Sequence, residues 1–315
     1  MAERHLADRH LADRHLADRL LADRILGRQT FSRQFNWLCD GTFNSAPLGF
    51  QLYTIHVTLC ETCTVPLVYA IAREKSQQLY EQIFSKLKEK RPPLNPLSIT
   101  IDYERAAINA INRIFPDANV YGCYFHFGQC LWRKIQNLGL QAWYNDPANA
   151  NLIKSIQALA FVPVPQVIES FQALLETIDE ETDDVLGDFL TYFEVTWIGA
   201  LQRGRRRRPL FSLEMWNVHF RQEEGLPRTT NSLEGWHRSF SQRMSIKHPT
   251  VCRLVAKIRK EQSEWELTVE QAMAGIAIRQ VKKKYLEVNK RINSIIQKYD
   301  EYTPVEFLRA LSHNL

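Results

Sequence analysis

The sequence has no apolar run near the roughly 18 residues that a membrane-spanning helix requires. Its first thirty residues carry a charge every few positions and so lack the apolar core of a secretory signal. Cysteine is scarce, with six residues among 315, and nothing in the spacing indicates an oxidising compartment. The sequence therefore argues against a membrane protein and against a secreted, disulfide-bonded one.

What remains is a soluble globular composition, 45% hydrophobic and 24% charged, with enough apolar mass for a core. The net charge of +5 is unevenly distributed along the chain. Residues 203–315 hold 22 basic and 12 acidic side chains, a net charge of +10, whereas residues 1–202 hold 18 and 23, a net charge of −5. The C-terminal third is therefore the part expected to face a polyanion.

Residues 1–33 consist largely of the five-residue repeat RHLAD, which decays toward its end. A period of five places successive leucines about 140° apart on a helix, so the repeat forms no continuous apolar stripe. We expect a low-complexity leader that is solvated and disordered.

Residues 34–126 carry the pattern of a mixed α/β core. Segments rich in aromatic and β-branched residues predict strands, and apolar residues at three-and-four spacing predict helices. The strands are expected at 35–43, 51–59, 65–72, 97–101 and 119–125, and the helices at 76–90 and 104–115. This order, βββαβαβ, is that of the RNase H-like fold.

After His126 the pattern becomes helical. Further helices are expected at 131–140, 151–159, 166–178, 185–201, 229–244, 250–270 and 276–298. We therefore predict an α/β protein with an RNase H-like mixed five-stranded sheet. An all-helical insertion at 127–228 interrupts it, a helix within 229–275 completes the core, and a basic helical tail follows at 276–315.

Three carboxylates stand out by position. Asp40 lies in the first predicted strand, Asp102 ends the fourth, and Glu234 lies on a predicted helix beside its core-facing stripe. The first and fourth strands of an RNase H-like sheet are neighbours, so Asp40 and Asp102 would lie side by side and could hold divalent cations, with Glu234 as a third ligand. By spacing alone, a turn aspartate and a surface ion pair explain such residues better than a metal site does.

The local sequence around these carboxylates resembles the Mutator-like element (MULE) transposase domain over about residues 37 to 250. The motifs that carry the resemblance are DGTF (40–43), QLYTIH (51–56), VPLVYA (65–70), TIDYERAA (100–107), GCYFHF (122–127), WIG (197–199) and NSLEGWH (231–237). The resemblance implies a DDE-type catalytic core. Asp40 and Asp102 match its two aspartates and Glu234 its glutamate, with Glu214, Glu223 and Glu224 as nearby rivals.

The resemblance also implies what the chain does. It predicts a nuclear transposase core, whole or relic, that nicks DNA and transfers strands with two Mg²⁺ or Mn²⁺ ions held by Asp40, Asp102 and Glu234. The partners would be transposon ends and target DNA, with self-association and no small-molecule substrate. Two alternatives stay open: a domesticated, inactive DNA-binding or protein-interaction factor, and an RNase H-like nuclease unrelated to transposition.

Besides the carboxylates, the sequence contains two pairs of residues that could bind a metal ion. Cys123-x-x-His126 resembles the Cys-x-x-His motif that follows the second aspartate in this superfamily, and it could touch a metal or DNA near the active site. Cys60-x-x-Cys63 supplies a second pair at a hairpin link. A structural zinc site needs four ligands, so a packed cysteine with a hydrogen-bonded histidine is the default for the first pair.

Basic residues supply the candidate DNA contacts. Arg203 and the run at 205–208 fall in the predicted helical insertion, and Arg238 follows Glu234 by four residues. Guanidinium groups pair with phosphate in two-point fashion, which suits contact with a DNA backbone. A solvated loop and a nuclear-import signal explain the arginine run equally well.

Overall fold

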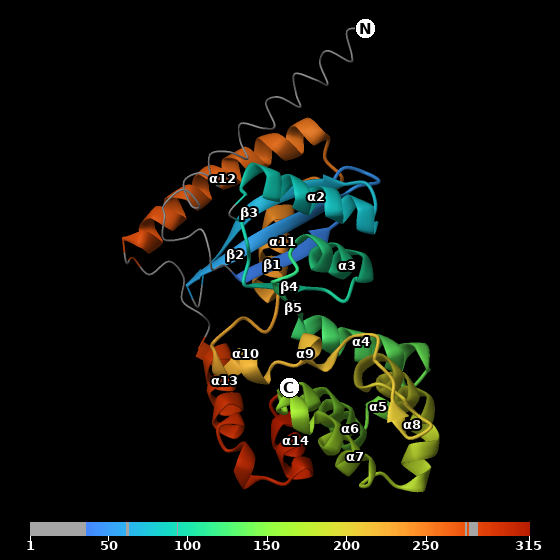
Figure 1. The fold of residues 1–315 in the computed structure, drawn as a ribbon. Coiled ribbons are helices and arrows are strands. Elements are labelled where there is room, and N and C mark those ends of the chain that lie inside the picture. The colour runs from blue at the N-terminus through green and yellow to red at the C-terminus, as the bar shows by residue number, and fades with distance from the viewer. Residues whose placement is uncertain (1–35, 61–62, 93, 275, 277–282) are drawn as a thin grey trace. The chain divides into compact units, whose positions relative to one another are not determined.

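The computed structural model describes residues 36–60, 63–92, 94–274, 276 and 283–315 (Figure 1). The repeat leader predicted at 1–33 lies outside the described residues. The described parts of residues 1–120 and 230–280 form one compact unit, here the sheet unit. Those of residues 121–229 and 281–315 form a second, the helical unit. The domain boundaries expected from the sequence stay predictions.

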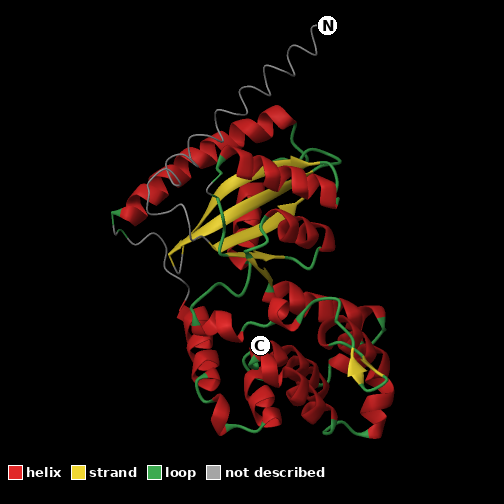
Figure 2. Cartoon of the chain, in the orientation of Figure 1, coloured by secondary structure: helices red, strands yellow, loops and turns green. Residues whose placement is uncertain are grey.

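The sheet unit is built on a five-stranded mixed sheet with the order β3-β2-β1-β4-β5 (Figure 2). β1 pairs antiparallel with β2 and parallel with β4, and β2 pairs antiparallel with β3. The strands are β1 (Asn36–Thr42), β2 (Gln51–Cys60), β3 (Cys63–Ala72), β4 (Ser98–Ile101) and β5 (Asn119–Gly122). The α/β class and the five-stranded mixed sheet are as predicted.

Alternation along β2 divides the core between the two faces of the sheet. Tyr53 packs its ring against Tyr80 of α2 (Gln77–Lys90), with ring centroids 5.1 Å apart, and α3 (Arg105–Ile114) packs beside α2. On the other face Leu52 belongs to a buried cluster with Trp236 and Phe240 of α11 (Asn231–Met244), which α12 (Val251–Met273) also joins. Helices therefore cover both faces of the sheet (Figure 1).

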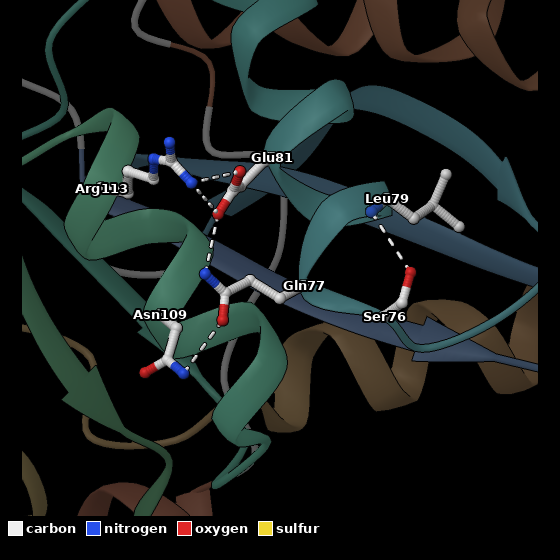
Figure 3. A network of polar contacts seen from close by, with 6 residues as sticks. All are labelled: Ser76, Gln77, Leu79, Glu81, Asn109 and Arg113. Atoms are coloured by element: carbon white, nitrogen blue, oxygen red, sulfur yellow. Dashed lines mark hydrogen bonds and ion pairs between the residues drawn. The ribbon is translucent and has the colours of Figure 1, made fainter.

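A polar network joins α2 to α3 on their outer surface (Figure 3). Arg113 of α3 lies 3.1 Å from Glu81 of α2, and Asn109 donates a hydrogen bond to Gln77. Gln77 also donates to Glu81, and this bond, followed by the charge of Arg113, lowers the pKa of Glu81. Ser76 accepts a hydrogen bond from the backbone amide of Leu79 and so caps α2.

The helical unit has an aromatic core. Phe127, Phe193, Trp197 and Trp216 are fully buried, and the rings of Phe127 and Trp216 stack 5.1 Å apart. Its α-helices are α4 (Tyr124–Asn137), α5 (Gln141–Tyr144), α6 (Pro147–Ala158), α7 (Val167–Leu175), α8 (Glu180–Phe193), α9 (Leu213–Trp216), α10 (His219–Glu223), α13 (Lys283–Ile296) and α14 (Pro304–Ser312). A π-helical turn (Glu194–Ile198) ends α8, and strands β6 (Leu201–Gln202) and β7 (Arg205–Arg206) follow it.

Several boundaries differ from the sequence prediction, and two of them have a clear physical reason. The fifth strand was expected to run to Phe125, but β5 ends at Gly122 and α4 begins at Tyr124. Tyr124, Phe127, Leu131 and Ile135 are buried at helical spacing, so burial overrides the β-type composition of this segment. The helix expected at 185–201 also ends early, because Gly199, with φ of 97°, turns the chain into the hairpin.

Two further features concern the C-terminal helices and the membrane. Residues 277–282 of the helix expected at 276–298 lie outside the described part, and α13 covers its remainder to Ile296. α14 was not predicted. Across the described residues, no helix combines the length and apolarity needed to cross a bilayer.

Candidate active site

Asp40 and Asp102 are placed by two neighbouring parallel strands. Residues 36, 37 and 38 of β1 pair with residues 98, 99 and 100 of β4. The same offset, continued two residues further, puts Asp102 level with Asp40. β4 is buried along its whole length and Asp102 is the first residue after it, so the strand delivers this carboxylate from the core to the edge of the sheet.

The two aspartates line one small pocket, which is open to solvent. β1 and β2 supply one wall, and α2, α3 and the segments that precede these helices supply the other. The remaining lining residues are Cys39, Gly41, Gln51, Tyr53, Lys75, Tyr80, Ile101, Glu104 and Ala107. A Cβ atom on Gly41 would lie 2.8 Å from Oε1 of Gln51, so a larger residue here would require the Gln51 side chain to shift.

The carboxylate of Asp40 is held from two sides. Its Oδ1 accepts a hydrogen bond of 2.7 Å from the backbone amide of Gly41. Its Oδ2 lies 3.2 Å from Nδ1 of His237 on α11, and the other ring nitrogen of His237 lies 3.0 Å from the hydroxyl oxygen of Thr54. Both side chains of the Asp40–His237 pair are about nine-tenths buried. The imidazole therefore fixes the orientation of Asp40.

Cys39 and Tyr53 contribute polar but uncharged groups to the lining of the pocket. Burial, helped by the charges of Asp40 and Asp102, raises the pKa of the Cys39 thiol to about 12. Burial also raises the pKa of Tyr53 well above its usual value. These two groups stay protonated at neutral pH, so the negative charge of the pocket belongs to its carboxylates.

Glu104 is a third carboxylate of the pocket that sequence reasoning did not select. Its Oε2 lies 2.7 Å from Nζ of Lys75, and its Oε1 is buried without a hydrogen-bond partner. The available signal was its position two residues after Asp102, at the first turn of a helix. Lys75, which follows β3, and His237 were also not predicted from the sequence. Each contacts its acidic partner, Glu104 or Asp40, only because the fold brings distant segments together.

Glu234 lies in the sheet unit with both aspartates, half-buried on α11, one turn before His237. It is not among the residues that line the pocket. Its rivals Glu214, Glu223 and Glu224 are exposed and belong to the helical unit. Within the described part of the chain, no three side chains among His, Cys, Asp and Glu are grouped closely enough to hold one metal ion.

The cysteine and histidine candidates lie in two places. Cys123 is buried at the N-cap position of α4, and His126 lies in the first turn of that helix, both in the helical unit. Cys123 therefore precedes a helix and is not a strand residue. Cys60 ends β2 and Cys63 begins β3, and their side chains are outside the described part.

The predicted DNA-contacting arginines fall into two sets. Arg203, Arg205, Arg207, Arg208 and Arg238 are exposed. Arg206 is only 18% exposed and lies 2.7 Å from Glu194, and the same NH1 donates to the carbonyl oxygen of Gly199. Arg206 is thus occupied within the protein, whereas the exposed guanidinium groups face solvent.

The donor chemistry of the pocket fits hard divalent cations. Asp40 and Asp102 lie at one level of adjacent strands, and carboxylate oxygens are the ligand type that Mg²⁺ and Mn²⁺ prefer. The unpartnered Oε1 of Glu104 adds a further oxygen in the same pocket. In ligand type, the residues of the pocket therefore suit such an ion.

Comparison with family models finds a similarity that covers the two aspartates of the pocket. No curated protein matches the chain. A family model described as the MULE transposase domain matches residues 36–129, from β1 into α4. The match includes Asp40, Asp102, Cys123 and His126, and it indicates a transposase-derived function. Residues 36–129, which carry the two aspartates of the pocket, resemble the MULE transposase domain.

Proposed function

We propose that this chain is the catalytic core of a DDE-type DNA transposase, or a relic of one. The observation that carries the proposal is the placement of Asp40 and Asp102 at one level of two adjacent parallel strands, in one pocket, within the segment that matches the MULE domain. Paired carboxylates in this position suit phosphodiester chemistry assisted by divalent cations.

The reaction has two displacements at phosphorus. In nicking, the oxygen of water bonds to the scissile phosphorus, the bond to the 3′ oxygen breaks, and a 3′-hydroxyl and a 5′-phosphate result. In strand transfer, that 3′-hydroxyl oxygen bonds to a phosphorus of the target, whose own 3′ oxygen leaves. Each step forms one P–O bond and breaks one, so no external energy source is needed.

The chain's own residues prepare this chemistry. Asp40, Asp102 and Glu234 would hold two Mg²⁺ or Mn²⁺ ions, which stabilise the attacking and leaving oxygens when bound. His237 keeps the Asp40 carboxylate in one orientation, and Lys75 compensates the charge of Glu104. The nucleus as the site of action, self-association, and element ends and target as the DNA partners belong to the same proposal.

The test is cleavage of DNA by the purified full chain. The substrate is a plasmid that carries the terminal repeats of the element, incubated with Mg²⁺ or Mn²⁺ and, in parallel, with a chelator. We expect metal-dependent nicking that Asp102→Asn abolishes. Asp117→Asn is the matched control, because Asp117 is exposed and lies outside the pocket, and it should cleave like the natural chain. Equal cleavage by the Asp102→Asn chain, or none by any chain, refutes the catalytic proposal.

A second candidate is a domesticated DNA-binding or protein-interaction factor that kept the fold. The contact of Asp40 with the His237 imidazole favours it, because it gives this carboxylate a partner within the protein. In that case the same assay shows DNA affinity that falls steeply with salt, without cleavage.

A further inference from the structure

The hairpin of β6 and β7 in the helical unit has an exposed tip that carries arginines. Residues 201–205 are all exposed. Arg203 and Gly204, with φ of 51° and 75°, form the two-residue turn between the strands. Positive φ at both positions is typical of the tight turn that matches the twist of a hairpin. The tip therefore has a defined shape that carries Arg203 and Arg205.

The base of the hairpin is rigidly anchored. Arg206 binds Glu194 and the carbonyl oxygen of Gly199, and the amide of Arg207 donates to the carbonyl oxygen of Ala200. A Cβ atom on Gly199 would lie 2.1 Å from the carbonyl oxygen of Arg207, so the chain segments meet closely here. Trp197, fully buried just before Gly199, ties this base to the aromatic core.

The tip of the hairpin is positively charged and has no acidic residue near it in the sequence. No acidic residue occurs between Glu194 and Glu214, while five arginines lie in that interval. Glu194 neutralises Arg206, which leaves Arg203, Arg205, Arg207 and Arg208 exposed. Exposed guanidinium groups on a fixed scaffold, with no ion pair to an acidic residue in the described part of the chain, suit a polyanionic partner.

The size of the hairpin indicates which polyanion it can enter. Three residues from Leu201 to Arg203 reach about 10 Å, and two paired strands lie about 4.8 Å apart. The major groove of B-form DNA is about 8.5 Å deep and 12 Å wide and admits a two-stranded ribbon, whereas the minor groove is about 6 Å wide. The major groove of A-form RNA is too narrow for side chains to read.

We propose that the β6–β7 hairpin reads duplex DNA in the major groove. Arg203 and Arg205 at the tip contact O6 and N7 of guanines, the commonest base contact of arginine. Arg207 and Arg208, beyond the second strand, contact the flanking phosphates, and Arg206 holds the base. The choice of DNA as partner rests on the proposed function, but the reading of sequence goes beyond it.

The test is in vitro selection with the full chain in the presence of a chelator, so that cleavage plays no part. The probe is a pool of duplexes with a random central segment. Affinity is then measured for a selected duplex and for one with its guanines replaced, across a range of salt concentrations. The two proposals fail separately: this one fails if no sequence is selected, and the catalytic one fails if no metal-dependent nicking occurs.

Two charge-matched double variants give the decisive comparison. Arg203→Ala with Arg205→Ala should lower the ratio of specific to non-specific affinity about 5- to 150-fold for each guanine that the hairpin no longer reads. Arg207→Ala with Arg208→Ala should weaken binding to both duplexes alike, reduce the salt slope by about two, and leave the ratio unchanged.

Methylation interference identifies the groove. The expected result is interference at guanine N7, which lies in the major groove. Interference at adenine N3, selection of no motif, a preference for duplex RNA, absence of binding, or equal loss of the ratio in both double variants would each overturn the proposal. Unchanged thermal unfolding of the double variants confirms that the helical unit is intact.

Discussion

The substitution Arg243→Met breaks the ion pair that joins α11 to α12. The buried carboxylate of Glu261 then loses its bidentate partner. Arg243 binds both oxygens of Glu261 through two hydrogen bonds of 2.6 Å. The Glu261 side chain is only 1% exposed, and its other cation, Lys257, lies 3.6 Å away. α11 carries His237 and Glu234, so this pair also fixes the helix that completes the candidate site.

The magnitude follows from the burial of the two partners. Removing one partner of a buried ion pair costs about 3–5 kcal/mol of unfolding free energy, because the remaining charge has lost its compensation. Arg243 is 41% exposed and Lys257 remains, so we expect a smaller loss of about 2–3 kcal/mol. For a unit of this size that corresponds to a decrease in Tm of about 5–10 °C.

Thermal and urea unfolding of the full chain check this value. Lys86→Met is the control, because the Lys86–Glu89 pair is 70% and 61% exposed and should contribute less than about 0.5 kcal/mol. Adding Glu261→Leu to Arg243→Met should restore most of the stability, since no charge is then left buried. The reasoning is refuted if Arg243→Met costs no more than Lys86→Met, or if the double variant is less stable than the single one.

The remaining predictions concern titration and two glycines. His56 is fully buried, and burial, followed by the nearby His237, lowers its pKa well below 6.5. As the pH falls, His56 therefore takes up a proton in the unfolded chain before it does so in the folded chain. The unfolding free energy should decrease by up to about 1.4 kcal/mol per pH unit below pH 6.5. Unfolding measured at pH 7.5 and 5.5 should show a smaller decrease for His56→Leu than for the natural chain. Gly199→Ala should destabilise the helical unit, because φ is 97° and the added Cβ meets the Arg207 carbonyl, as measured by urea unfolding. Gly187→Ala, inside α8 with nothing within 4 Å of the new Cβ, should instead raise the unfolding free energy by up to about 1 kcal/mol.

The sheet was largely predictable because its strands are locally distinctive. β2 and β3 differ from the expected ranges by one or two residues, and α2 begins one residue late. The neighbouring positions of Asp40 and Asp102 followed from the strand order, since one register aligns both residues. The strand expected at 119–125 was extended too far, because its valine, tyrosines and phenylalanine favour a strand locally, whereas burial in the helical unit places Tyr124 in a helix.

The contacts of the site were less predictable because they join distant residues. His237 meets Asp40 across nearly two hundred residues, and Lys75 meets Glu104 across a helix and a strand. No local pattern encodes such a pair. The hairpin was also missed, because its strands of two residues are too short for any alternation to appear. Its arginines were visible in the sequence, but the separation of Arg206 from the others required Glu194 to be placed beside it.

The π-helical turn at Glu194–Ile198 sets the direction in which the hairpin leaves the helical unit. Such a turn holds one more residue than an α-helical turn over the same span. Loss of one residue from this segment would therefore let an α-helical turn cover the same span. Each residue turns an α-helix by about 100°, so loss of one residue from the regular part of α8 would instead rotate the hairpin by that angle, a larger change than any single substitution at the tip would cause.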